Sequence, residues 1–227
     1  MENKYLEKSL FIFFSIIPLS IILGPAISLI NILIVNVLFL FFLYIFKDFR
    51  FLNNKIVIFL FILNIYLIFN SVISIDPMIG IKRNLGFLRF ILLFIAFNYF
   101  FYSSKDPKKI FLWWFIILLI FTLDVYIEFI TGSNILGFGD KKKFFPRIVS
   151  FFKDEPIAGA YVLGFFLIII GYLFDNFDKK NNLNKFIIYF LSFLFLFSII
   201  VSGERSNAIK AMGTFIVFFS INHFVKI

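Results

Sequence analysis

Residues 186–225, FIIYFLSFLFLFSIIV-SGERSN-AIKAMGTFIVFFSINHFV, decide the fold. Two apolar runs, Phe186–Val201 and Gly213–Val225, are typical of helices that cross a bilayer, so the polar break between them predicts a short hairpin between membrane helices. Glu204 and Arg205 lie in that break, and charged residues at membrane depth are costly and commonly mark a substrate or ion site. An ordinary interfacial loop is the alternative interpretation.

The rest of the chain has the same apolar character. Hydrophobic residues occupy 62% of the 227 positions, and the mean hydropathy is +1.01, well above the usage of soluble domains. We therefore predict an all-α, polytopic transmembrane helix bundle that forms a single domain over residues 1–227. The absence of Cys and the single His exclude disulfide frameworks and Cys/His metal or haem sites, and we expect no cofactor.

Counting apolar stretches against the roughly 20 residues that span a hydrocarbon core predicts about eight helices. They are Leu10–Leu23, Ala26–Phe46, Ile56–Ile75, Asn84–Tyr102, Ile110–Ile130, Ile157–Phe174, Phe186–Val201 and Asn207–Val225. Pro18 in the first stretch predicts a kink, or a hairpin packed on the second helix through Gly24-Pro25.

The distribution of Lys and Arg favours a cytoplasmic N-terminus. In that topology the basic residues on the opposite side gather in three places: next to Asp76-Pro77, in the loop Thr131–Pro156, and at Arg205. We expect these three places to share one face, and that face to bind anions. Because the net charge of +9 is spread over both membrane faces, nucleic acid is not a predicted partner.

Arg147 and Arg205 are the strongest candidates for contact with an anion. Arg147 lies between Pro146 and an apolar pair, and Arg205 lies in a tight Ser-Gly-Glu-Arg-Ser turn; a guanidinium group offers phosphate oxygens a bidentate fork. If Arg205 is structural instead, it pairs with Glu204, Asp124 or Glu128.

Further basic residues have simpler explanations. Arg83 and Arg89 are candidates that could equally extend to the membrane interface, and Lys141–Lys143 could lie in solvent or contact lipid head groups.

Asp124 and Glu128 lie four residues apart near the end of the fifth predicted helix, and therefore on one face. They could form an acid/base pair, but we favour pairing with a neighbouring Arg or Lys, or a position at the interface. His223 lies near the cytoplasmic end of the last helix, so we discount it as a catalytic base.

Five short motifs, in order along the chain, resemble landmarks of the O-antigen ligase and polymerase superfamily of bacterial inner-membrane proteins. They are Ile17–Ser20 with Gly24-Pro25, Ser74–Pro77, Tyr126 to Thr131-Gly132, Arg147–Pro156 and Ser202–Ser206. The resemblance implies a periplasmic face that binds an undecaprenyl-pyrophosphate-linked glycan through arginines and transfers it without metal or nucleotide, in lipopolysaccharide biosynthesis. It also implies that Arg205 and Arg147 contact the pyrophosphate. Arg83 and Arg89 are further substrate-binding candidates that rest on their charge alone.

Members of that superfamily are usually much longer and carry a large periplasmic loop with a His that resembles a catalytic base. By that comparison we expect the chain to be the N-terminal part of such a protein, with a separate C-terminal half as a candidate partner and no transferase activity alone. The residues that could replace the base are Asp124, Glu128, Asp154 and Glu204. Two other classes stay open: a small transporter with an intramembrane relay, and a non-catalytic binding or assembly subunit.

Overall fold

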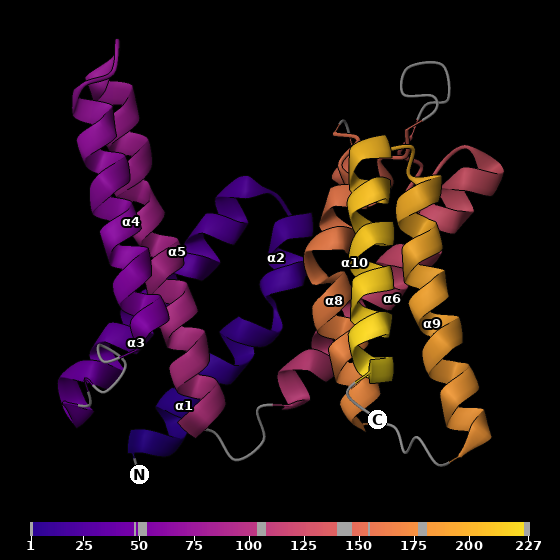
Figure 1. Ribbon diagram of the computed structural model, residues 1–227, viewed down its shortest axis with the longest axis horizontal. Helices are drawn as coiled ribbons and strands as arrows, with labels where there is room; N and C mark the ends of the chain where they lie inside the picture. The colour runs from indigo at the N-terminus through magenta and orange to yellow at the C-terminus, as the bar shows by residue number, and fades with distance from the viewer. Residues whose placement is uncertain are drawn as a thin grey trace. The chain divides into compact units, whose positions relative to one another are not determined.

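The computed structural model describes residues 2–47, 49, 54–103, 108–139, 147–153, 155–176 and 181–224. Every regular element in these ranges is a helix (Figure 1). In chain order they are α1 (Glu2–Ser15), α2 (Ile17–Ile22), α3 (Pro25–Phe46), α4 (Lys55–Val72), α5 (Pro77–Ser103), α6 (Lys108–Thr131), the 3-10 turn η2 (Ser150–Phe152), α8 (Ala158–Asn176), α9 (Asn182–Val201) and α10 (Arg205–Phe224). The predicted all-α fold is confirmed for these residues.

Six helices are long and apolar enough to cross a membrane: α3, α4, α5, α6, α8 and α9. The chain is therefore a multi-pass membrane protein. The other two predicted spans do not meet that criterion within the described ranges. The first is divided at Ile16 into α1 and α2, where Pro18 in the first turn of α2 has no amide hydrogen to donate. The last forms α10, whose first turns carry Arg205, Asn207 and Lys210 and are less apolar.

Helix α5 begins at Pro77, whereas the sequence predicted a span from Asn84. Pro is favoured in the first turn of a helix, where its missing amide hydrogen costs nothing, and the Asp76 carboxylate accepts a hydrogen bond from the Ile79 amide at 3.4 Å. Arg83 is therefore part of the helix and not of the preceding loop.

Residues Met1–Ile110 form one compact unit, unit 1. Amide side chains join its helices: Asn64 Nδ2 donates to the Asn84 carbonyl at 2.9 Å, and Asn84 Nδ2 donates to Ser71 Oγ at 2.6 Å. Gly80 lets α4 and α5 approach closely, because a Cβ at that position would lie 2.9 Å from the Ser71 Cβ. Small residues and interhelical hydrogen bonds are the usual means of helix association in lipid.

Residues Phe111–Ile227 form the second compact unit, unit 2. Helices α8, α9 and α10 pack side by side (Figure 1). Aromatic side chains attach α6 to them: the Trp114 ring lies 5.3 Å from that of Phe165 on α8, and Phe115 lies 6.1 Å from Phe195 on α9. The single transmembrane domain expected from the sequence stays a prediction beside this division into two compact units.

Candidate anion-binding site

Segments that are far apart in the sequence meet at one end of unit 2. They are the last turns of α6, residues 132–139, residues 147–153 with η2, the start of α8, and the turn between α9 and α10. The Ile148 amide donates to the Ser202 carbonyl at 3.1 Å, which places Arg147 beside the α9–α10 turn. Two of the three basic groups predicted to share a face are thus brought together. The third, next to Asp76-Pro77, belongs to unit 1.

The α9–α10 turn depends on Gly203. This residue has a φ of 78°, in the left-handed region that Gly adopts at little cost. The preceding Ser202 is buried, and its hydroxyl donates to the Ile199 carbonyl at 2.7 Å. Because α10 starts at Arg205, the backbone amides of its first turn have no acceptor within the helix and give this end a partial positive charge.

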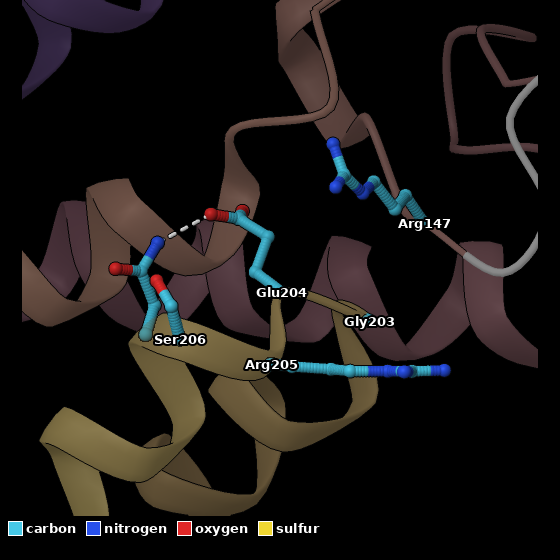
Figure 2. Close-up of a pocket in the computed structure, with 6 residues that line it drawn as sticks. Arg147, Gly203, Glu204, Arg205 and Ser206 are labelled. Carbon is cyan, nitrogen blue, oxygen red and sulfur yellow. Dashed lines mark hydrogen bonds between the residues drawn. The ribbon is translucent and has the colours of Figure 1, made fainter.

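A half-open pocket of about 480 Å³ lies at this turn, lined by Arg147, Gly203, Glu204, Arg205, Ser206 and Asn207. Arg147 and Arg205 come from different segments, and both side chains are exposed. Figure 2 shows Arg205 extending away from the Glu204 carboxylate. Neither arginine has a hydrogen-bond or ion-pair partner among the described residues.

Glu204 is the acidic residue of the pocket, and its carboxylate is already engaged. Its Oε1 accepts hydrogen bonds from the amides of Gly159 at 2.6 Å and Ala160 at 3.3 Å, in the first turn of α8. Its other oxygen accepts one from Asn207 Nδ2 (Figure 2). Glu204 therefore caps α8, where the helix dipole favours negative charge. The alternative in which Arg205 pairs with Glu204 is not observed in the described part of the chain.

Asp124 and Glu128 are both buried, and the predicted pairing with Lys or Arg is not observed in the described ranges. Asp124 accepts hydrogen bonds from the Ile135 amide at 3.0 Å and from Ser150 Oγ at 2.6 Å. Glu128 accepts from the amides of Val149 at 3.2 Å and Ser150 at 2.6 Å. The two carboxylates thus hold the backbone of the loop that carries Arg147, and Arg205 contacts neither.

The sequence did not single out Ser150 or Gly159 as residues of this site. Gly159 matters because a Cβ there would collide with Ser202 Oγ and lie 3.1 Å from Glu204 Oε1. Buried Asn134 completes the loop: its Nδ2 donates to the Ser150 carbonyl at 3.0 Å. A Gly at the start of an apolar helix, or an Asn in a turn, is too common in sequences to have marked these roles.

Arg83 and Arg89 belong to α5 of unit 1, and neither is among the residues that line the pocket of unit 2. The Arg89 guanidinium carbon lies 4.8 Å from the centre of the Phe90 ring, and the Arg89 carbonyl accepts a hydrogen bond from Asn36 Nδ2 at 2.9 Å. Lys141–Lys143, Asp154 and the side chain of His223 lie outside the described residues.

Comparison with family models, with curated proteins and with solved structures found no match to this chain.

Proposed function

We propose that unit 2 binds the phosphate groups of a lipid-linked glycan, of the undecaprenyl-pyrophosphate type, at the Arg147–Arg205 pocket. The wider role would be O-antigen ligase-like glycan transfer in surface polysaccharide assembly at a bacterial inner membrane. One observation supports this proposal above the others: two arginines from distant segments line one pocket, and both are without an ion-pair partner among the described residues.

The charges in the pocket favour an anion. The Glu204 carboxylate accepts hydrogen bonds from the first amides of α8 and from Asn207, which compensate its charge locally. Both guanidinium groups of the pocket therefore remain available to a ligand. The first turn of α10 adds backbone donors, which bind phosphate oxygens together with a guanidinium fork. A diphosphate offers enough oxygen acceptors for both kinds of donor.

The position of the pocket suits a lipid head group. It lies where α9, an apolar helix of 20 residues, ends at Val201 and α10 begins. At about 1.5 Å per residue such a helix is close to 30 Å long, which matches the hydrocarbon core of a bilayer. A ligand with a polyprenyl tail could therefore keep the tail in lipid while its phosphates reach the pocket.

The pocket supplies one of the two requirements of glycan transfer. The two guanidinium groups would stabilise the negative charge that develops on a pyrophosphate leaving group. Deprotonation of the acceptor hydroxyl needs a base as well. Among the candidates that the structure describes, Asp124, Glu128 and Glu204 all accept hydrogen bonds from backbone amides. This favours, as second candidate, a binding or assembly subunit that holds the donor without activating the acceptor.

The test is binding of a polyprenyl pyrophosphate to the protein in nanodiscs, compared with the polyprenyl monophosphate, the free polyprenol and phosphatidylglycerol. Arg205→Lys keeps the charge and removes the bidentate fork. We expect it to weaken pyrophosphate binding by about tenfold, or roughly 1.4 kcal/mol.

Lys210→Ala is the matched control, because Lys210 is an exposed cation of α10 that does not line the pocket. Its affinity should equal that of the original protein. Equal affinity for pyrophosphate and phosphatidylglycerol would reduce the site to general attraction of anionic lipid. Unchanged binding by Arg205→Lys would remove Arg205 from the site.

A further inference from the structure

Ser150 is held at each of its three polar groups. Its amide donates to Glu128 at 2.6 Å, its hydroxyl donates to Asp124 at 2.6 Å, and its carbonyl accepts from Asn134 at 3.0 Å. We call these four residues the Ser150 latch. All four side chains are buried, and Asn134 also accepts hydrogen bonds from two neighbouring backbone amides.

The backbone conformation of Ser150 is intrinsically unfavourable. Its φ is 50°, in the left-handed region that a residue with a Cβ rarely occupies. Such conformations persist where the surroundings over-determine them, and the three hydrogen bonds of Ser150 do so here. The latch therefore stabilises a turn whose backbone conformation Ser150 would otherwise rarely adopt.

That turn lies three residues after Arg147, and every residue between them is also held. The Ile148 amide donates to the Ser202 carbonyl at 3.1 Å, and the Val149 amide donates to Glu128 at 3.2 Å. Both side chains are buried, whereas Arg147 is exposed. The segment is thus anchored to α6 at one end and to the α9–α10 turn at the other, with Arg147 as its free side chain.

We infer that Asp124 and Glu128 are positioning residues of the anion pocket: through Ser150 they set the backbone that presents Arg147 beside Arg205. Neither carboxylate lines the pocket, so neither would touch the ligand. The effect on binding rests on the proposed function, whereas the placement of Arg147 can be measured without any ligand.

The two carboxylates should respond differently to conversion to amides. In Asp124→Asn the new Nδ2 can donate to the Ser150 hydroxyl, which can accept as well as donate, while Oδ1 still accepts from Ile135. In Glu128→Gln the side-chain NH₂ group must face the backbone N–H of either Val149 or Ser150. Two donors then oppose each other, because a backbone N–H cannot act as an acceptor. Asp124→Asn should therefore keep most of the latch, and Glu128→Gln should release it.

The placement of Arg147 can be followed by cross-linking, since the chain has no Cys of its own. Arg147→Cys and Ser206→Cys put thiols at two residues that line the pocket and come from different segments, where a short bifunctional methanethiosulfonate can join them. We expect efficient cross-linking in the original background, most of it retained in Asp124→Asn, and severe loss in Glu128→Gln. Glu155→Gln, the same change at an exposed residue of the same loop, is the matched control.

A double-mutant cycle then tests the route of the effect. Glu128→Gln should weaken polyprenyl pyrophosphate binding by about tenfold, but should have no further effect once Arg147→Ala is present. If Glu128→Gln does not accumulate in the membrane, Asn134→Ala replaces it, because it releases the Ser150 carbonyl without changing a membrane helix.

The outcomes separate the two ideas. If cross-linking depends on Glu128 but the protein does not bind pyrophosphate, the latch is supported and the proposed function is overturned. Cross-linking that is unaffected by Glu128→Gln would overturn the latch, as would effects of Glu128→Gln and Arg147→Ala that add in full.

Discussion

Gly159, the second residue of α8, is where α8 touches the α9–α10 turn. A methyl group there would collide with Ser202 and crowd Glu204, so we expect Gly159→Ala to push the turn away and to lower the free energy of unfolding by about 1–3 kcal/mol, the usual cost of overpacking. Thermal unfolding in detergent would measure it. Gly164→Ala on the same helix is the control, since a Cβ at Gly164 has open space.

The two substitutions should differ in their effect on the free energy of unfolding: Gly159→Ala should lower it, and Gly164→Ala should not. Ala is favoured over Gly inside a helix by roughly 0.5–1 kcal/mol, so Gly164→Ala should be neutral or stabilising. Equal effects of both changes would mean that Gly159 is not a contact point, and that Glu204 does not depend on its small size.

At the scale of single residues, the location of the two arginines was easier to predict than the partners of the two buried carboxylates. Arg147 and Arg205 were chosen for their charge in apolar surroundings, and the structure places both at one pocket. Asp124 and Glu128 were expected to pair with basic side chains or to lie at the interface, and their partners in the structure are mostly backbone amides of residues 135, 149 and 150. Every non-proline residue carries such an amide, so these partners leave no mark in a sequence.

Between elements, Asn84 is one of the polar residues that join α5 to α4. Its Nδ2 donates to the Leu67 carbonyl at 2.9 Å and to Ser71 Oγ at 2.6 Å. Interhelical hydrogen bonds in membranes are worth about 0.6 kcal/mol on average and at most about 1.7 kcal/mol, so Asn84→Ala should cost about 1 kcal/mol.

Asn98→Ala is the comparison within the same helix, because among the described residues Asn98 donates only to the Phe94 carbonyl one turn away. It should change the unfolding temperature of the protein less than Asn84→Ala does. A larger effect at Asn98 would show that the α4–α5 contact rests on apolar packing instead.

Helix boundaries were predictable where polarity changes sharply, and less so where a proline sets the first residue of the helix. The end of α9 at Val201 was predicted to the residue, because Ser202 and Gly203 follow a long apolar run. The start of α5 was predicted too late, since the apolar span was counted from Asn84, after the basic residues Lys82 and Arg83, whereas the helix starts at Pro77. Hydropathy locates the apolar part of a membrane helix and underestimates its polar ends.

For the molecule as a whole, composition was sufficient to predict an all-helical membrane protein, while six of the eight predicted spans are long, apolar helices within the described ranges. The stretch around Pro18 and the polar start of α10 were counted as crossings, and neither is a long, apolar helix in the described ranges. The division into two compact units was not predicted, because it depends on which helices contact one another. A pattern of apolar residues shows that a face is buried, but not against what.

The predicted topology places the pocket on the periplasmic side, and the two ends of unit 2 provide the test. Leu136 is exposed in the loop after α6, at the pocket end, and Asn182 is exposed at the opposite end of α9. We expect Leu136→Cys to react with a membrane-impermeant maleimide in intact cells, and Asn182→Cys to react only after permeabilisation, because the bilayer would separate these ends by about 30 Å. The chain has no other Cys, so each signal reports one position. The reverse labelling pattern would put the pocket in the cytoplasm, where a periplasmic glycan could not reach it, and the proposed function would fail with the topology.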